Sequence, residues 1–425
     1  MDSFSSELQD LLRKVAQGLD LKEFTTSPPD KNVSKKEDGY IGIIESLDIL
    51  NKEGNKALSL ILKRAPISEK LRKQFPTRQA FLREIEFYVN VFPEFLQFQK
   101  EYNISKPFTN VTNCYGVITE EYKELLLLQN LKEEGFRLVN RQQPMDSNHL
   151  SLGLTVYGKL HAISHAMKRL HPRRFEKLTS NIKYNFMGRT EEKSNTTGPT
   201  PEEFNVLTHM LFDITLQALQ DQPKLIEAVE YIQKTLTKET MSFMLSSDEF
   251  NSNEFAVVSH TDCWSANIMF KYDESDQNFP IDLKLIDWQT SFLCDPMYDF
   301  SYFLFINAGK NDLKDYKKYL GLYHQSLCNY LKDFGLDPST FYPLELLHNQ
   351  FKEKWTLGFY MCLLMMQQSL STKKTHDFEE LADQGKNVFD PKNRQIEMSD
   401  IFKQRMADLV AFIADNLLFH RAAHC

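Results

Sequence analysis

The chain has 425 residues, of which 42% are hydrophobic and 25% charged, a balance that supports a large folded core and excludes disorder as the main state. Its formal net charge of −8 does not attract a polyphosphate backbone, so nucleic acid is not an expected partner. The six cysteines form neither a CxxC pattern nor a Cys/His cluster, which argues against a zinc site or a disulfide framework and favours a reducing, cytoplasmic location.

The first 36 residues predict a helix followed by a linker. Apolar residues recur at helical spacing over residues 4–20, and Pro28 with Pro29 ends the pattern before a polar run. From residue 37 the sequence becomes β-like: IGIIESLDIL, a KEGN turn and ALSLILK predict an antiparallel hairpin. We assign residues 37–130 to a small, β-rich lobe.

Gly39 lies in a turn just before this hairpin. Such a turn could bring backbone N–H groups near a phosphate, although a glycine turn before a strand is most often only a turn. The chain contains no GxxxxGK[ST] sequence that would indicate a Walker-type phosphate loop.

Lys63 ends the second strand of the hairpin, and the next helix, predicted to close at Pro93, carries Glu84 and Glu86. A lysine that leaves a buried strand needs a carboxylate partner and can then bind the α- and β-phosphates of ATP. Helical periodicity does not choose between the two glutamates, because both have apolar neighbours. A solvated lysine at a strand end is the alternative.

A strand pair near residues 116–118 and 124–129 completes the small lobe. The next residues, Gln129 to Leu131, would link the two lobes, where backbone groups can pair with the edge of an adenine ring. An ordinary exit from a strand would have the same local sequence.

Residues 131–425 are predicted to form a larger, mainly helical C-lobe. His161 lies on an apolar helix face, where a hydrogen-bonded core histidine is the simpler interpretation. Short strands at 255–259, 268–272 and 283–286 interrupt the helices. We expect the catalytic residues at this loop and hairpin. Long helices are expected near 150–170, 203–220, 222–245, 312–332, 341–371 and 398–417.

The catalytic loop is predicted at residues 260–267 (HTDCWSAN), followed by a metal-binding hairpin at 268–289. Phosphoryl transfer needs a carboxylate that deprotonates the attacking hydroxyl and oxygen ligands that hold Mg²⁺ against the nucleotide phosphates. An Asp and an Asn five residues apart on one tight loop can face the same point, and the hairpin brings back a second Asp. We therefore predict Asp262 as the base, with Asn267 and Asp287 as Mg²⁺ ligands. Loop-capping roles for all three are the alternative.

These residues resemble the ecdysteroid kinase-like proteins of arthropods, relatives of choline and aminoglycoside kinases. Residues 260–269 are similar to that family's HGDxWxxNxM, and residues 287–289 (DWQ) stand where the family has DFQ. Residues 295–304 (DPMYDFSYFL) are similar to its DPxxDLxYFL.

The resemblance continues upstream and covers essentially the whole chain. Residues 61–66 (ILKRAP) and 81–88 (FLREIEFY) resemble the family's lysine strand and glutamate helix, and this match selects Glu84. Residues 160–162 (LHA) also fit. The implied fold is α+β, protein-kinase-like and two-lobed, with ATP in the cleft between a small β-rich N-lobe and a larger helical C-lobe.

By the same resemblance, His260 would brace the catalytic loop and Asp299 would support it from below. Three departures from the family pattern are present. Thr261 replaces a glycine, Trp288 replaces a phenylalanine, and QN at 129–130 replaces Glu-Asp at the hinge. The reacting oxygens and the hinge backbone are unaffected.

The implied function is transfer of the γ-phosphoryl group of Mg-ATP to a hydroxyl of a small organic acceptor. The family name points to ecdysteroids or other lipophilic alcohols. Trp355, Phe359, Tyr360 and Met361 could line an acceptor site, although so apolar a helix is most often core.

Two alternatives differ in class. A protein kinase is disfavoured because HTD replaces HRD, DWQ replaces DFG, and neither APE nor GxGxxG is present. A catalytically idle kinase-like fold that binds nucleotide or a lipophilic ligand would keep the same architecture. No apolar run approaches the ~20 residues that span a bilayer, and no obligate protein partner is evident.

Overall fold

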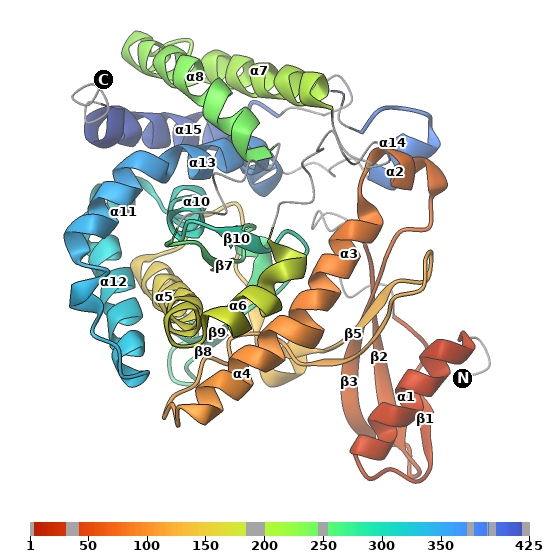
Figure 1. Ribbon diagram of the computed structural model, residues 1–425. Coiled ribbons are helices and arrows are strands. Elements are labelled where there is room, and N and C mark those ends of the chain that lie inside the picture. The colour runs from red at the N-terminus through yellow and green to blue at the C-terminus, as the bar shows by residue number, and fades with distance from the viewer. Residues whose placement is uncertain are drawn as a thin grey trace.

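The computed structural model describes residues 4–30, 42–183, 200–244, 254–371, 378–388, 390 and 397–418. Gly39, the predicted phosphate turn, lies outside the described residues. Figure 1 shows an antiparallel sheet beside a larger assembly of helices. This arrangement confirms the predicted α+β, two-lobed, protein-kinase-like fold.

The N-lobe contains a five-stranded antiparallel sheet in the order β1-β2-β3-β5-β4. The predicted hairpin forms its centre and turns at Gly54, whose φ of 81° lies in the left-handed region that glycine adopts without strain. The strands are β1 (Phe24–Thr26), β2 (Ile43–Asn51), β3 (Lys56–Arg64), β4 (Cys114–Ile118) and β5 (Leu125–Gln129), and the short helix α2 (Glu69–Gln74) follows β3.

Successive leucines of β5 point to opposite faces of this sheet, as the two-residue period of a strand requires. Leu125 and Leu127 pack under α1 (Ser6–Gly18), whereas Leu126 and Leu128 belong to the main core. The first 36 residues, predicted as a helix and linker, thus supply a helix that covers the sheet and a strand, β1, that pairs with β2. The domain limits at residues 36 and 130 stay predictions.

The helix predicted to close at Pro93 continues beyond it, so that prediction is wrong. α3 (Thr77–Glu86) passes through a π-helical turn (Phe87–Val91) into α4 (Phe92–Glu101). Pro93 lies in the first turn of α4, where its missing N–H costs little, because the π turn has already shifted the hydrogen-bond pattern. In Figure 1, α3 and α4 form one long rod beside the sheet.

The C-lobe consists mainly of helices, as predicted. Its helices are α5 (Ser147–Leu170), α6 (Pro172–Thr179), α7 (Pro201–Ala218), α8 (Pro223–Met244), α10 (Met297–Asn307), α11 (Lys310–Lys314), α12 (Tyr316–Asp333), α13 (Leu344–Leu370), α14 (Phe378–Asp383) and α15 (Asp400–Ile413). α5 packs against α12, and α10, buried along its whole length, packs against α13. Among the described residues, none of the helices has the length and apolar character to cross a bilayer.

Two small sheets form the predicted β interruption. β8 (Ile268–Tyr272) and β9 (Pro280–Leu285) make the predicted hairpin, and β6 (Arg137–Leu138) adds a third strand. β7 (Val257–Ser259) pairs with β10 (Phe292–Cys294), a strand that lies beyond Asp287. Because this pairing is antiparallel, the loop after β7 and the segment before β10 meet at one end of the pair.

Candidate active site

Lys63 lies near the end of β3 with its ammonium group between two carboxylates. Its Nζ is 2.7 Å from Oε2 of Glu84 and 2.9 Å from Oδ1 of Asp287. Burial alone would lower the pKa of Lys63, but the charges of Asp287 and Glu84 raise this pKa overall. The lysine is therefore protonated, and three predicted site residues from a strand, a helix and a loop form one ion network.

Glu84, rather than Glu86, faces Lys63. The Glu84 side chain is fully buried, and burial, with the nearby charge of Asp287, raises its pKa, whereas Lys63 opposes that rise. Glu86 instead accepts a hydrogen bond from Asn90 over 2.8 Å at the surface. The structure thus places next to the lysine the same glutamate that the family resemblance selects.

Asp262 and Asn267 lie on the loop between β7 and β8 and contact each other directly. Asn267 Nδ2 donates to Asp262 Oδ2 over 2.7 Å and to the backbone carbonyl of Asp262 over 3.1 Å. A 3₁₀ turn (Ser265–Asn267) brings the two side chains to the same side of the loop. Tyr302 of α10 donates to the other carboxylate oxygen, Oδ1, over 3.3 Å.

The pKa of Asp262 is raised to about 7, first by burial and then by the negative charge of Asp287. Asn267 and Tyr302 oppose this rise because their side chains donate to the carboxylate. A carboxylate that titrates near neutral pH suits a general base. Asp262 and Asp287 keep partial solvent exposure, whereas Asn267 is buried.

Asn267 and Asp287 carry oxygen ligands of the type that Mg²⁺ prefers. No group of three or more His, Cys, Asp or Glu side chains that could hold a metal occurs in the described part of the chain. The pair fits Mg²⁺ in a nucleotide site, because this ion is commonly held by one or two carboxylates together with phosphate oxygens. The raised pKa of Asp262 beside Asp287 also fits, because a divalent cation would offset the repulsion between these carboxylates.

Asp287 follows β9 with a φ of 64°, a left-handed conformation that aspartate tolerates better than most residues. The next residue, Trp288, is buried and stacks on Phe87 of the π-helical turn, with 3.6 Å between ring centroids and 6° between planes. Trp288 therefore packs the segment that carries Asp287 against the α3–α4 rod. The indole also contacts the ring of His260, with 4.5 Å between ring centroids.

Asp299, near the start of α10, is fully buried and accepts four hydrogen bonds. The backbone N–H groups of His260 and Thr261 donate over 2.7 and 2.8 Å, the His161 ring over 3.1 Å, and the Cys263 thiol over 3.3 Å. Burial opposes ionisation, but the two histidines outweigh it and hold the pKa of Asp299 below its usual value. An ionised Asp299 thus anchors the backbone of the catalytic loop.

The two histidines hold the loop from different sides. His260 Nε2 donates to the carbonyl of Ile286 over 2.9 Å, and its Nδ1 accepts from the N–H of Asp262 over 3.3 Å. Burial lowers the pKa of His260, in agreement with a neutral ring. His161, interpreted from the sequence as a core histidine, is fully buried and bonded through both nitrogens, to a tyrosine of α12 and to Asp299.

The predicted hinge begins at Gln129, the last residue of β5. The Gln129 side chain accepts from Asn113 over 2.8 Å, and Asn130 caps the 3₁₀ turn (Leu131–Glu134) that follows. Leu131 is buried in a small apolar cluster that includes Met269. The structure therefore places the hinge next to β8, and the contact with adenine stays a prediction.

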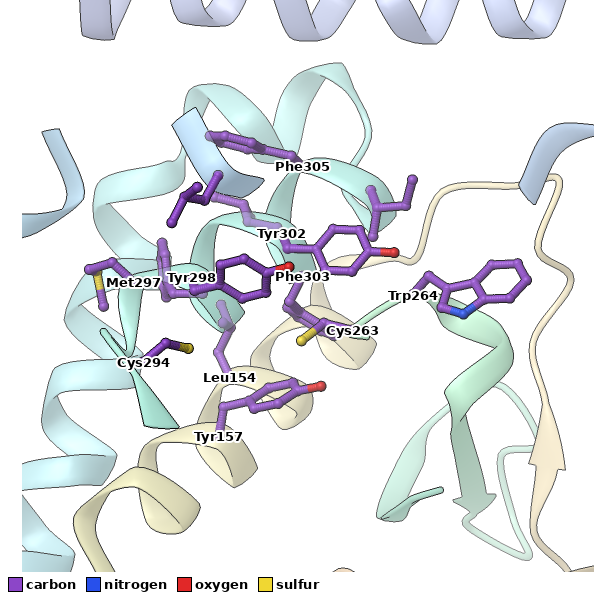
Figure 2. Close-up of a cluster of buried hydrophobic side chains, with 14 of the residues drawn as sticks. Leu154, Tyr157, Cys263, Trp264, Cys294, Met297, Tyr298, Tyr302, Phe303 and Phe305 are labelled. Carbon is purple, nitrogen blue, oxygen red and sulfur yellow. The ribbon is translucent and has the colours of Figure 1, made fainter. Parts of the chain in front are cut away.

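Tyr302 and Asn307, both on α10, contact the catalytic loop but were not singled out from the sequence. Asn307 Nδ2 donates to the carbonyl of Cys263 over 2.9 Å. Figure 2 shows aromatic rings from α5 and α10, Tyr302 among them, gathered beside the loop that carries Cys263 and Trp264. For Tyr302 the signal was the motif at 295–304, because polar groups on so apolar a helix need buried partners.

The apolar residues of α13 that were candidates for the acceptor site belong to the core. Trp355, Phe359 and Tyr360 are buried, and Met361 is partly exposed against the same cluster. α13 packs on α10, so these side chains stabilise the helix that carries Asp299.

Comparison with known proteins gives one family. Among curated proteins, no sequence matches the chain. Two GDP complexes of aminoglycoside 2'-phosphotransferase-IIIa resemble it in three dimensions: a point mutant (10% identity, TM-score 0.41, covering 97% of this chain and 99% of its own) and the wild type (11%, 0.39, 97% and 100%). Likenesses at these TM-scores say nothing about the site. The profile of the ecdysteroid kinase-like family matches residues 36–336, well over half of the sequence, and the chain therefore belongs to the ecdysteroid kinase-like family.

Proposed function

We propose that the protein is an ATP-dependent kinase that transfers the γ-phosphoryl group to a hydroxyl of a small organic acceptor. The observation that carries this proposal is the 2.7 Å contact between Asp262 and Asn267, beside an Asp287 that lies 2.9 Å from the buried Lys63. A candidate base, two candidate metal ligands and a candidate phosphate-binding lysine therefore share one site. The family membership supports the same class of reaction.

In the proposed reaction, Asp262 accepts the proton of the acceptor hydroxyl while the acceptor oxygen attacks the γ-phosphorus. A P–O bond forms to the acceptor, and the bond between the γ-phosphorus and the β–γ bridging oxygen breaks. The products are a phosphate ester and ADP. Asp262 then releases its proton to solvent, which its partial exposure permits.

The nucleotide would lie between Lys63 and the hinge. Lys63, held by Glu84, would contact the α- and β-phosphates. Leu131, Met269 and Ile286 share one apolar cluster beside the hinge, which supports an adenine ring at that place. Asn267 and Asp287 would hold Mg²⁺, which would supply positive charge against the phosphates.

For the acceptor, we propose a lipophilic alcohol such as an ecdysteroid. The rings of Trp264 and Tyr302 stand beside the candidate base, which supports an apolar acceptor, and the family name supports steroid alcohols. Phosphorylation would give a charged, water-soluble conjugate. A screen with labelled ATP against steroid and other hydroxyl compounds, with identification of the product, tests the class of acceptor.

The nucleotide site is tested by thermal shift. ATP should raise the melting temperature of the wild type with Mg²⁺ but not with EDTA, and Asp287→Ala should lose that response. Asp262→Asn should keep the response yet lose turnover by about 10²–10⁴-fold, the usual weight of a positioned base. Asp276→Asn, in the exposed hairpin turn, is the matched control. Full turnover by Asp262→Asn would refute its role, and nucleotide binding without turnover on a broad panel would favour an idle fold.

We also propose a cytoplasmic location. The five cysteines within the described residues are all free, which fits a reducing compartment. Fractionation of the native tissue or cell tests this, and recovery in a secreted fraction would contradict it.

A further inference from the structure

Thr261 has a backbone conformation that its side chain disfavours. Its φ is 65°, in the left-handed region, and a β-branched residue there is strained. Of the five described non-glycine residues with positive φ (Asp20, Asn103, Tyr122, Thr261 and Asp287), it alone is β-branched. Strain of this type persists only where the surroundings hold the residue in place, and it is concentrated at functional sites.

Two hydrogen bonds hold Thr261 in this conformation. Its backbone N–H donates to Asp299 Oδ1 over 2.8 Å, a bond that any residue could make. Its hydroxyl donates to the backbone carbonyl of Thr290, also over 2.8 Å, a bond that requires a hydroxyl at position 261. Thr261 is 2% exposed, so this second bond is shielded from water.

The bond to Thr290 holds the chain on the C-terminal side of Asp287. On the other side, His260 donates to the carbonyl of Ile286 over 2.9 Å. The segment 286–290 is therefore tied to the catalytic loop both before and after Asp287. Thr290 also donates to the carbonyl of His260 over 3.4 Å, a longer bond in the opposite direction.

We infer that Thr261 is a positioning residue that sets the place of Asp287 relative to Asp262 through its hydroxyl bond to residue 290. The inference rests on the proposed kinase function and deepens it. Without this hydroxyl, the segment after Asp287 would lose the shorter of the two side-chain bonds that join residue 290 to residues 260 and 261. In this role, Thr261 acts through the position of Asp287.

Thr261→Gly separates strain from positioning. Glycine adopts positive φ freely, so the melting temperature should stay constant or rise. If Thr261 only stabilised the fold, the melting temperature of this variant should fall. Binding of a fluorescent ATP analogue can be measured as a function of Mg²⁺ concentration. Loss of the hydroxyl bond should raise the Mg²⁺ concentration at half-maximal binding about fivefold, because a factor of this size corresponds to the free energy of one hydrogen bond. The kcat should fall by a similar factor, with little change in the KM of the acceptor.

Two further variants complete the experiment. Thr261→Ser restores the hydroxyl and should return the Mg²⁺ dependence to within about twofold of the wild type, whereas Thr261→Ala should behave like the glycine variant. Thr155→Ala removes a hydroxyl that bonds within α5, outside the two loops, and is the control. The alanine and serine pair decides the question if the glycine variant does not fold.

The outcomes separate the two proposals. In one outcome, nucleotide binding by the wild type depends on Mg²⁺, and the glycine and alanine variants show the same Mg²⁺ dependence. That result refutes the role of Thr261 and leaves the kinase proposal standing. If the wild type binds nucleotide without regard to Mg²⁺, both are refuted. A loss of Mg²⁺ affinity in glycine and alanine, rescued by serine, is the expected result.

Discussion

Asp262 is held by a separate donor on each carboxylate oxygen. Asn267 occupies Oδ2, and Tyr302, which comes from a helix 40 residues away in the chain, occupies Oδ1. Both donors stabilise the charged form, whereas burial and Asp287 favour the protonated form. The acidity of the candidate base is thus a balance between neighbours, and removal of one neighbour should shift it in a known direction.

Tyr302→Phe removes a donor that lowers the pKa of Asp262, so this pKa should rise above about 7. Because the base acts deprotonated, the acid limb of the profile of kcat/KM against pH should move to higher pH, by about half a unit to one unit for one hydrogen bond. Tyr319→Phe, which removes a hydroxyl bonded to Asp312 on the far helices, is the control. An acid limb that stays in place would show that Tyr302 does not tune the base.

Asp262→Asn should also change stability in a pH-dependent way. A carboxyl group whose pKa is raised on folding favours the folded state only while it is protonated, so its contribution declines as pH rises from about 4 to about 7. The neutral amide avoids this loss. The melting temperature of the variant, relative to that of the wild type, should therefore be higher at pH 8 than at pH 5, and the reverse order would contradict the raised pKa.

At the scale of elements, α3 connects the sheet to the segment around Asp287. Glu84 points to β3, and the preceding residue, Arg83, donates to the carbonyl of Ser291 over 2.8 Å. One helical turn thus contacts both Lys63 and the segment that follows Asp287. The ion pair between β3 and α3 is fully enclosed, so loss of either partner leaves an uncompensated charge.

Lys63→Met should raise the KM for ATP, lower kcat and destabilise the fold, because Glu84 loses its cation. The destabilisation should be larger at pH 8 than at pH 6, since Glu84 has a raised pKa and can take up a proton at the lower pH. In the double variant Lys63→Met/Glu84→Leu, stability should recover while activity does not. Unchanged KM and kcat in Lys63→Met would make it a purely structural lysine.

At the scale of the whole molecule, residues 378–388 reach from the C-terminal part of the chain to the N-lobe. Figure 1 shows α14 against α2, and the two helices share a separate apolar cluster that contains Leu71, Phe75 and Leu381. Lys70 also donates to the carbonyl of Asp383 over 2.7 Å. We call residues 378–388 the strap.

The strap acts on a helix that is tied to α3. Arg72 of α2 and Arg78 of α3 each lie 2.7 Å from the buried carboxylate of Glu124. These pairs lower the pKa of Glu124 although burial alone would raise it. The strap, α2 and α3 therefore form one packed unit, and α3 carries Glu84.

Leu381→Ala should loosen this unit. Truncation of a buried leucine costs about 2–5 kcal/mol, so the melting temperature should fall. Because α3 is then held less firmly, the KM for ATP should rise several-fold, while the KM of the acceptor changes little. Ile401→Ala, at an exposed position of α15, is the control. A drop in stability with an unchanged KM for ATP would limit the strap to a structural role.

Local patterns predicted what local geometry controls. The hairpin of β2 and β3, the helices of the C-lobe, and the contact between Asp262 and Asn267 lie within short stretches of chain, where periodicity and turn residues are informative. The continuation of α3 past Pro93 was not predictable in this way, because it depends on a π-helical turn whose aromatic residues are buried by distant helices.

The sequence by itself therefore determined the fold class, the family and the residue types of the candidate site. Only the tertiary structure decided how these residues meet: that Lys63 lies between Glu84 and Asp287, that Tyr302 and Asn267 share Asp262, and that Thr261 bonds to residue 290. The physical reason is that a hydrogen bond between residues far apart in the chain leaves no periodic pattern in sequence. Its existence depends on the packing of the elements that carry the two partners.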